Sequence, residues 1–462
     1  MHVKRPGPVL VALALFATAC ASVPTPQARP GKPSAAKPPA AAAVKQRAAA
    51  LDAEEFRKAL EESYETIVAR STTPAPIVDA DASLSMPMPD HRTIQGAVSY
   101  FSTDLQASIQ DSLYRSSRYK SMIVKVLDEY RLPRGLAYLP VIESAYIPTL
   151  TSRAGARGMW QFMPPTAREY GMRVDWWVDE RCDPEISTRA AARFLRDLYR
   201  EFGDWSLVLA AYNAGPGRVR RALAESNSTT FWDLLEKTAV PRETRGYVPT
   251  FYATLHIVSD PATYGFALVE DEEAELDQLA VDGPVTLAYV ATAAGVDEAE
   301  LEDLNPAFRR GLLPPGRTAI RMPKGTASRI ADRAARLRDE DPSLPVAMMT
   351  VRKGDSLERI AKRLKVPVTD LLSMNGRKKN DLRPGDSIYL PVRQEEVSAL
   401  RQPVDRYYSV RKGDTLFAIA RAHGLTVDEL RDLNDLTKNH VLHPGDRLRI
   451  SLGTATLAGG GS

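Results

Sequence analysis

The sequence repeats itself near the C-terminus. The first copy reads VRKGDSLERIAKRLKVPVTDLLSMNG followed by LRPGDSIYLPV. The second copy reads VRKGDTLFAIARAHGLTVDELRDLND followed by LHPGDRLRISL. In both copies the order of apolar and turn residues predicts strand, helix, helix, strand, with turns at Gly-Asp, Asn and Pro-Gly-Asp. We therefore expect two small α+β (βααβ) modules, at residues 346–393 and 405–452. The matched turn residues are Gly354 with Gly413, Asp355 with Asp414, and Asn375 with Asn434.

A weaker third copy precedes these two. LAYVATAAGVDEAELEDLNP and LLPPGRTAIRMP keep the helix pattern, Asn305 and a Pro-Gly turn, but lack the Lys-Gly-Asp opening. We expect a degenerate module of the same kind at residues 277–323.

The N-terminus has the layout of an export signal. Two basic residues precede a nine-residue apolar stretch, at 9–17, that is too short to span a bilayer, and small residues lead up to Cys20. These small residues before a cysteine resemble the lipobox of bacterial lipoproteins, although Ala17 stands where leucine is usual. We expect residues 1–20 to be a lipoprotein-type signal peptide and Cys20 to carry a lipid, on the periplasmic face of the outer membrane. Ordinary signal cleavage to a soluble exported protein is the alternative.

The next residues predict a spacer. Residues 21–50 are rich in Pro and Ala and cannot bury enough apolar surface to fold, so we interpret them as a tether. Residues 51–90 predict a short helix, at 51–70, followed by a Pro-rich linker.

Charge and cysteine content exclude several classes of function. The 462 residues include 61 Lys and Arg against 58 Asp and Glu, so the net charge of +3 gives no reason to expect nucleic acid as a partner. Of the two cysteines, Cys182 has no partner in the chain if Cys20 is lipidated. No nucleophile motif surrounds Cys182, so we predict a structural thiol.

Residues 91–264 predict a compact helical domain. The apolar residues of MIVKVLDEY recur at i, i+3, i+4 and i+7, which places them on one helix face. In STRAAARFLRDLYREFG, Ser187 or Thr188 is expected to cap the start of a helix and Gly203 to end it.

One carboxylate in this domain lies in an apolar run. LPVIESAY, residues 139–146, contains Glu143 after four residues without a polar side chain. A general acid must keep its proton near neutral pH, and apolar surroundings raise the pKa of a carboxyl group. Pro140 is expected to interrupt the local helix and Pro148 to end it, so that Glu143 faces a cleft from a helix end.

Four segments together give the domain its family resemblance. In order and spacing they resemble the goose-type lysozyme-like catalytic domain of lytic transglycosylases. The four segments are IESAY, SRAGARGMWQFMPPTAREYG, LAAYNAGPGRV and ETRGYVPTFYA. Members of that family cleave peptidoglycan between N-acetylmuramic acid and N-acetylglucosamine and leave a 1,6-anhydro sugar. The C-terminal repeats resemble LysM modules, which bind glycans that contain N-acetylglucosamine. The resemblance implies peptidoglycan strands as the substrate and partner.

The resemblance also implies roles for single residues. Glu143 is the expected acid/base, and Ser144 is expected to position it or the sugar. The other substrate-binding residues that the resemblance implies are Gly158, Met159 and Gln161 in the loop that lines the cleft, Tyr212 and Asn213 near the acid, and Tyr247, which hydrogen-bonds the glutamate. The implied glycan-binding residues of the LysM-like repeats are Gly354, Asp355, Asn375, Gly413, Asp414 and Asn434.

The number of carboxylates bears on the reaction. Ordinary glycosidases use a pair of carboxylates. Glu169 and Glu243, the other carboxylates in these segments, lie in polar sequence and are predicted to be solvated helix positions. A single acid suits a reaction in which the sugar's own O6 attacks C1. Two alternatives stay open: a peptidoglycan hydrolase of the same fold, and a non-catalytic wall-binding protein.

Aromatic and histidine residues give weaker signals. Trp160 and Tyr170 are either core residues or sugar-stacking platforms, whereas core packing is favoured for Trp176 and Trp177. His440 and His443 lack a third ligand, and the sequence has no His-Glu-x-x-His motif, so we expect no metal and no cofactor.

Overall fold

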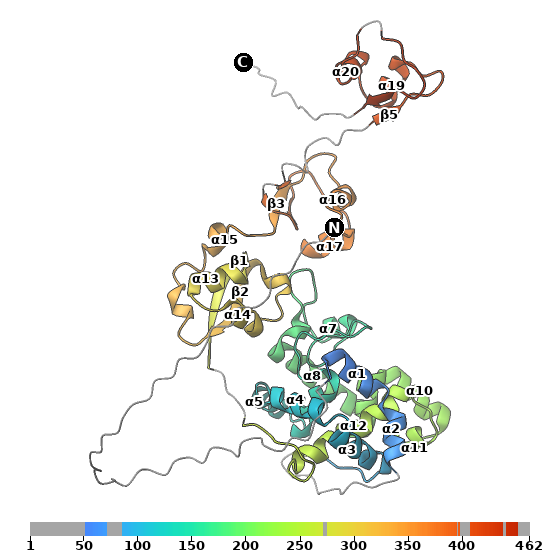
Figure 1. The fold of residues 1–462 in the computed structure, drawn as a ribbon, viewed down its shortest axis with the longest axis vertical. Coiled ribbons are helices and arrows are strands. Elements are labelled where there is room, and N and C mark those ends of the chain that lie inside the picture. The colour runs from blue at the N-terminus through green and yellow to red at the C-terminus, as the bar shows by residue number, and fades with distance from the viewer. Residues whose placement is uncertain are drawn as a thin grey trace, which may run out of the picture. The chain divides into compact units, whose positions relative to one another are not determined.

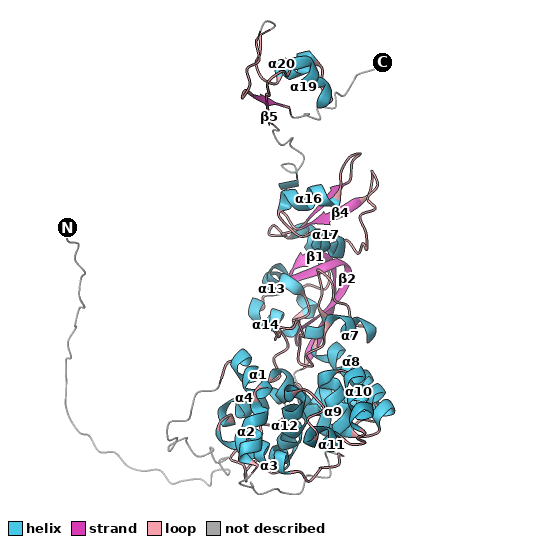
Figure 2. Cartoon of the chain, turned by 90° about the vertical axis from the view of Figure 1, so that its right-hand side faces the viewer, coloured by secondary structure: helices cyan, strands magenta, loops and turns pink. Residues whose placement is uncertain are grey.

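The structure is a computed structural model that describes residues 51–71, 86–270, 275–394, 396–397, 407–437 and 440–450 (Figure 1). The predicted signal peptide, Cys20 and the tether lie outside these residues. Within the described residues a mainly helical domain is followed by three units that each contain a two-stranded sheet (Figure 2). The predicted fold class, a helical domain followed by small α+β modules, is confirmed.

The helical domain is assembled from short and medium-length helices. Its elements are α1 (Ala53–Glu61), α2 (Ser63–Arg70), α3 (Arg92–Thr103), α4 (Gln106–Ser116), α5 (Lys120–Glu129), η2 (Arg134–Tyr138), α6 (Leu139–Ser144), α7 (Pro164–Glu169), η3 (Glu180–Cys182), α8 (Pro184–Phe202), α9 (Trp205–Ala214), α10 (Pro216–Ser226), α11 (Phe231–Glu236) and α12 (Arg242–Ser259). None of the helices in the described residues combines the length and apolar character needed to cross a bilayer.

The core of this domain lies around α9 and α12, which are buried over most of their length. Helices α2, α3 and α9 all contact α12. Helix α2 approaches α3 very closely, because a Cβ atom added at Gly96 would lie 2.1 Å from the carbonyl oxygen of Ile67. The two N-terminal helices are therefore part of the helical domain and not a separate appendage.

Two helix boundaries differ from the sequence prediction. The predicted helix at 51–70 is two helices that meet at Glu62. The cap of helix α8 lies four residues before Ser187, the earlier of the two predicted caps: Asp183 accepts hydrogen bonds from two backbone N–H groups, and Pro184 occupies the first turn. Ser187 and Thr188 consequently lie inside the helix. Gly203 ends it as predicted, with φ of 68°.

Each of the three following units has the predicted strand, helix, helix, strand order. The first contains β1 (Leu276–Thr286), α13 (Leu287–Ala294), α14 (Glu298–Leu304), η4 (Arg309–Gly311) and β2 (Leu312–Pro323), followed by η5 (Ala327–Arg329) and α15 (Leu337–Glu340). The second contains β3 (Ala347–Thr350), α16 (Leu357–Leu364), α17 (Val368–Met374) and β4 (Ser387–Leu390). The third contains β5 (Tyr407–Ser409), α19 (Leu416–Ala422), α20 (Val427–Asp432) and β6 (Arg447–Arg449).

The strands pair antiparallel in every unit, with Leu276 opposite Pro323, Ala347 opposite Leu390, and Tyr407 opposite Arg449. One asparagine per unit, Asn305, Asn375 or Asn434, follows the second helix. Its amide donates to a carbonyl of that helix and to a carbonyl of the second strand, and its oxygen accepts an N–H from the same strand. The shared pattern shows that the degenerate copy folds like the other two.

Candidate active site

Glu143 lies in the last turn of α6. Pro140 occupies the first turn of this helix, where a missing backbone N–H removes no hydrogen bond, so the expectation that Pro140 interrupts a helix is wrong. The helix ends when Ala145 adopts a left-handed conformation, with φ of 50°. Leu139 and Val141 are fully buried, whereas Glu143 keeps part of its surface exposed. The helix end thus presents one carboxylate from an otherwise buried segment.

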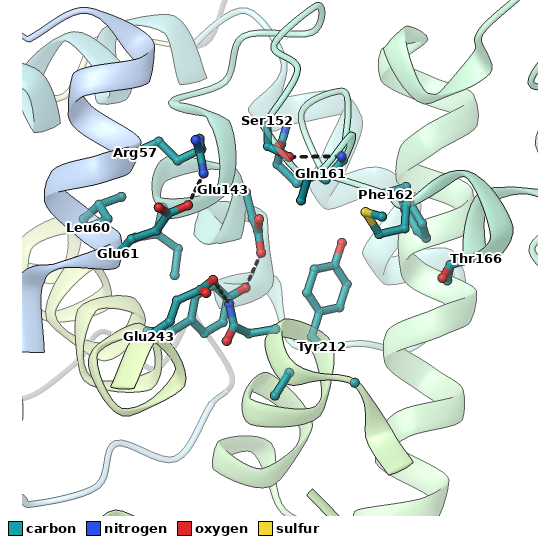
Figure 3. A pocket seen from close by; sticks show the side chains of 18 of the residues that line it. Arg57, Leu60, Glu61, Glu143, Ser152, Gln161, Phe162, Thr166, Tyr212 and Glu243 are labelled. Atoms are coloured by element: carbon teal, nitrogen blue, oxygen red, sulfur yellow. Dashed lines mark hydrogen bonds and ion pairs between the residues drawn. The ribbon is translucent and has the colours of Figure 1, made fainter. Parts of the chain in front are cut away.

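This carboxylate faces a cavity in the helical domain (Figure 3). The cavity is lined from several sides by residues that are far apart in the sequence. They include Arg57, Leu60 and Glu61 from α1, Ile142 and Glu143 from α6, Gln161 and Phe162 from the following loop, Tyr212 and Asn213 from α9, and Glu243 and Tyr247 from α12.

The surroundings of Glu143 favour its protonated form. Burial raises the pKa of this carboxyl group from 4.5 to about 8, and the charge of Glu243 adds to the increase. The hydroxyl of Tyr247 donates a hydrogen bond to Oε1 of Glu143, and this bond partly offsets the increase in the pKa. At neutral pH this carboxyl group therefore holds a proton that it can donate.

Two tyrosines stand beside the acid and keep their own protons. Burial, with the nearby charge of Glu143, raises the pKa of Tyr212 and of Tyr247 well above the usual value for a phenol. Tyr212 donates a hydrogen bond to the carbonyl oxygen of Trp160 at 2.7 Å. Trp160 is fully buried and donates its indole N–H to Thr188 at 2.9 Å, so it is a core residue and not a stacking platform.

The amide of Asn213 is occupied by neighbouring protein groups. Its Nδ2 donates to Oε1 of Glu243 at 3.0 Å, and its Oδ1 accepts the hydroxyl of Thr244 at 2.7 Å. Asn213 thereby links the end of α9 to the start of α12. Glu243 is exposed, as predicted, but the sequence did not predict that Glu243 lines the cavity.

Part of the loop after α6 packs behind the residues that line the cavity, and several of its own residues are buried. Ser144 is buried and donates to the carbonyl oxygen of Met159 at 2.8 Å, and Met159 is itself buried. A Cβ atom at Gly158 would lie 1.8 Å from the carbonyl oxygen of Arg181. Gly158 and Met159 therefore lie behind the residues that line the cavity, and their contacts with sugar stay a prediction. The bond from Ser144 to this loop favours a positioning role for Ser144 over direct contact with sugar.

Gln161 is the predicted loop residue that does line the cavity. Its backbone has φ of 47°, and its side-chain amide donates to the carbonyl oxygens of Leu150 and Gly158 at 3.2 and 2.8 Å. The side-chain oxygen of Gln161 is thus turned away from these two carbonyls.

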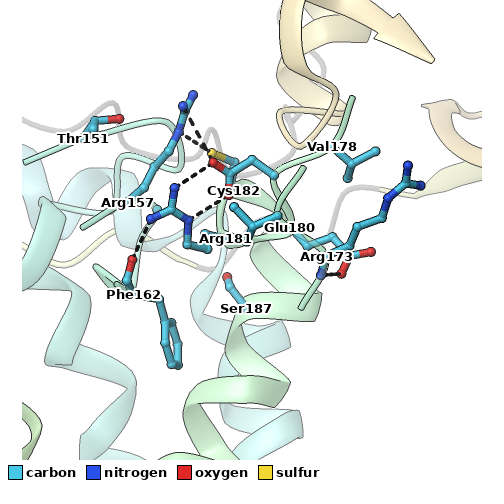
Figure 4. A network of polar contacts seen from close by, with 12 residues as sticks. Thr151, Arg157, Phe162, Arg173, Val178, Glu180, Arg181, Cys182 and Ser187 are labelled. Atoms are coloured by element: carbon cyan, nitrogen blue, oxygen red, sulfur yellow. Dashed lines mark hydrogen bonds and ion pairs between the residues drawn. The ribbon is translucent and has the colours of Figure 1, made fainter. Parts of the chain in front are cut away.

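A buried polar network braces the same loop (Figure 4). Arg181 donates two hydrogen bonds to the carboxylate of Asp179 and one each to the carbonyl oxygens of Gly155 and Phe162. Burial alone would raise the pKa of Asp179, but the bonds and charge of Arg181, together with the charges of Arg157 and Arg309, outweigh burial and lower that pKa. The network fixes both ends of the loop that carries Gln161.

Cys182 belongs to this network. It is buried, and Nε of Arg157 donates to its sulfur at 3.0 Å. Burial raises the pKa of the Cys182 thiol to about 11, so the thiolate that a nucleophile needs is absent at neutral pH. These contacts agree with a structural thiol.

The other aromatic residues in question are packed against protein. Trp176 and Trp177 are 6% and 2% exposed and lie in an apolar cluster that includes Ala307 and Leu312. Tyr170 hydrogen-bonds Asp197 at 3.3 Å and does not line the cavity.

The predicted glycan-binding residues of the modules make contacts within their own modules, and their role in binding stays a prediction. Asn375 and Asn434 use both ends of their amides in the helix-to-strand bonds described above. Asp355 and Asp414 accept backbone N–H groups within their own turns. Gly354 and Gly413 have φ of 95° and 92°, a conformation that few other residues adopt. Each of these Asn and Asp side chains thus makes at least one hydrogen bond within its own module.

The sequence did not predict that helix α1 forms part of the cavity wall. Arg57, Leu60 and Glu61 carry no recognisable motif, and only the amphipathic helix pattern marked their position. Among the residues that the structure describes, no group of three or more His, Cys, Asp or Glu side chains is placed to hold a metal ion.

Comparisons with known families agree with this organisation. The Transglycosylase SLT domain family matches residues 122–235, and the LysM domain family matches residues 349–391 and 408–451. The family described as "Lytic transglycosylase MltD, LysM-like domain" matches residues 275–339, which include the degenerate copy.

Individual relatives extend the match. The soluble lytic murein transglycosylase of Escherichia coli K12 is 34% identical over 116 residues, 24% of this chain and 18% of that protein. The solved structure of the 70 kDa soluble lytic transglycosylase from Escherichia coli shares 26% identity over 37% of this chain and 27% of that one, with a TM-score of 0.29, too low to support a structural argument. The membrane-bound lytic murein transglycosylase D of Escherichia coli K12 is 34% identical over 358 residues, 74% of this chain and 78% of that protein. The chain belongs to the lytic murein transglycosylase D family.

Proposed function

We propose that Glu143 is the acid/base with which this lytic murein transglycosylase cleaves the β-1,4 bond between N-acetylmuramic acid and N-acetylglucosamine. The observation that carries the proposal is the state of this carboxyl group, which lines the cavity, accepts a hydrogen bond from Tyr247 and has a pKa raised to about 8. A group in this state is ready to protonate a leaving oxygen at neutral pH.

The proposed reaction needs one carboxyl group for two proton transfers. Glu143 gives its proton to the glycosidic oxygen as the bond from that oxygen to C1 of N-acetylmuramic acid breaks. The O6 hydroxyl of the same sugar then bonds to C1, and its proton passes to the Glu143 carboxylate. The products are a 1,6-anhydro sugar and a free hydroxyl on the departing strand, and no water is consumed.

The other proposed site residues surround this centre. The hydroxyl of Tyr247 stabilises the carboxylate after its proton has left, because a hydrogen bond to an ionised group is stronger than one to a neutral group. Tyr212, Gln161 and Asn213 line the same cavity and are proposed to position the glycan. Ser144 acts indirectly, by holding the loop through Met159.

Hydrolysis by the same fold is the competing reaction, and Glu243 gives it a specific basis. A second carboxylate at the cavity wall is what a water-activating base requires. Mass spectrometry of the muropeptides released from purified peptidoglycan separates the two. We expect products lighter by one water than reducing-end sugars. Reducing-end products would assign the chain to hydrolysis, and no release by the intact protein would favour a wall-binding role.

We further propose that the LysM modules hold the enzyme on peptidoglycan and that a lipid on Cys20 attaches it to the outer membrane. The N-terminal signal pattern supports the lipid, as does the name of the relative, a membrane-bound enzyme. Cys20 lies outside the described residues.

The lipid proposal predicts a change of cell fraction. The intact protein should fractionate with membranes and begin at an acylated Cys20, whereas Cys20→Ala should be recovered as a soluble periplasmic protein. Subcellular fractionation with mass spectrometry of the N-terminal peptide measures both. An unmodified N-terminus in the intact protein would show that ordinary signal cleavage operates instead.

A further inference from the structure

Helix α1 forms one wall of the active-site cavity, although it lies outside residues 122–235, which match the transglycosylase family. The helix is firmly fixed. Asp52 caps its start by accepting the backbone N–H groups of Glu54 and Glu55, and Phe56 is buried in the core. Helix α1 also contacts α6, which carries Glu143, and α12. A side chain on its inner face is therefore held at a defined place relative to the acid.

Arg57 orients a carboxylate on this face. Its guanidinium donates to both oxygens of Glu54, at 3.1 and 3.2 Å, and to Oε1 of Glu61. Only 14% of the Arg57 side chain is exposed, against 39% for Glu61. Arg57 is thus largely enclosed in the wall with its terminal nitrogens occupied, whereas Glu61 presents the polar surface (Figure 3).

The carboxylate of Glu61 has spare hydrogen-bonding capacity. Oε1 takes the bond from Arg57, and within the described part of the chain no hydrogen bond reaches Oε2. A glycan strand is rich in neutral donors, its hydroxyl and acetamido N–H groups. Because an ionised acceptor makes stronger hydrogen bonds than a neutral one, a carboxylate held by an arginine suits such donors. An anionic group such as a peptide carboxylate suits this wall less well, since Glu54 and Glu61 occupy the terminal nitrogens of Arg57 and the nearby Arg153 is already paired with Glu54.

We propose that Glu61 is a substrate-binding residue, whose carboxylate accepts a hydrogen bond from a hydroxyl or acetamido N–H of the glycan bound in the cavity. The proposal rests on the function proposed above and adds a contact to it. Arg57 is the positioning residue for Glu61. The role concerns binding and not proton transfer, because burial, Tyr247 and Glu243 set the pKa of Glu143.

The decisive variant is Glu61→Gln. Glutamine preserves the size of the side chain and an oxygen for Arg57, but it replaces the second acceptor with a donor. On soluble, uncross-linked glycan strands we expect KM to rise about tenfold or more, since losing a hydrogen bond to a charged group has an effect of that order. We expect kcat and the pH dependence of kcat/KM to stay close to those of the parent enzyme.

Two further variants separate a loss of binding at Glu61 from a general loss of charge and from a change in the pKa of Glu143. Glu62→Gln makes the same change at the next residue, which is exposed and does not line the cavity, and should leave KM unchanged. Glu243→Gln removes a charge that raises the pKa of Glu143, so it should move the basic limb of the pH profile to lower pH. An unchanged KM in Glu61→Gln would overturn the proposal, as would a shift of its pH profile like that of Glu243→Gln.

Binding measured without turnover provides a second test. In a Glu143→Gln background, adding Glu61→Gln should weaken binding of the same strands by the factor seen in KM. Equal affinities with and without the Glu61 change would contradict the contact. Failure of the intact enzyme to release anhydro products is a separate result, which would remove the proposed function and leave the binding measurement interpretable.

Discussion

Glu143→Gln should lose about 10²-fold to 10⁴-fold in the rate of anhydro-muropeptide release, the usual contribution of a general acid/base. The same variant should be more stable than the parent protein at neutral pH. Both effects have one cause, because the environment that keeps the acid protonated also opposes its ionisation. Release of soluble products from purified peptidoglycan measures the rate.

The stability effect has a defined sign and pH range. In the unfolded chain Glu143 ionises near its ordinary pKa of 4.5, whereas in the folded chain it ionises near 8. Between these values the unfolded state binds fewer protons, so the free energy of unfolding of the parent protein falls as pH rises. Glutamine does not titrate. Its advantage should be roughly 2–4 kcal/mol at pH 7 and less than about 1 kcal/mol at pH 5.

Tryptophan fluorescence makes this measurement specific to the catalytic domain. All five tryptophans of the chain lie between residues 160 and 232, inside that domain. Urea unfolding followed by this signal, at pH 5 and pH 7, compares variant and parent. An equal advantage at both pH values would mean that the raised pKa does not cause it, and full activity in Glu143→Gln would refute the assigned acid.

Gly158→Ala should be the most destabilising single-methyl substitution in the active-site loop. The added Cβ atom would lie 1.8 Å from the carbonyl oxygen of Arg181, which the buried network holds in place, and φ of 89° is unfavourable for alanine. We expect a loss of at least about 3 kcal/mol in the free energy of unfolding, the scale of overpacking together with backbone strain.

Gly155→Ala is the matched control in the same loop. Gly155 has nearly the same φ, 87°, but no atom lies within 4 Å of the position that its Cβ would take. This change should cost about 1 kcal/mol, from backbone strain alone. The same urea titration compares the two variants. Equal losses would show that close packing against Arg181 does not explain the glycine.

The repeat and helix patterns predicted the architecture because they reflect local rules. Apolar spacing sets which helix face is buried, and Gly or Asn marks turns, so three βααβ units and a helical domain followed from neighbouring residues. Helix ends were less predictable: Asp183 and Ser187 are both good caps, and Pro184 in the first turn favours the earlier one.

The sequence by itself determined the domain order, the family resemblance and the unusual chemistry of Glu143, because an apolar run around a carboxylate is visible without a structure. Only the tertiary structure decided where the other predicted site residues lie and which groups they contact. It placed Gly158 and Met159 behind the cavity wall, and it brought Glu61 and Glu243 to the cavity from distant helices. The physical reason is that burial and hydrogen-bond partners depend on contacts between segments far apart in the chain, and residue order does not specify those contacts.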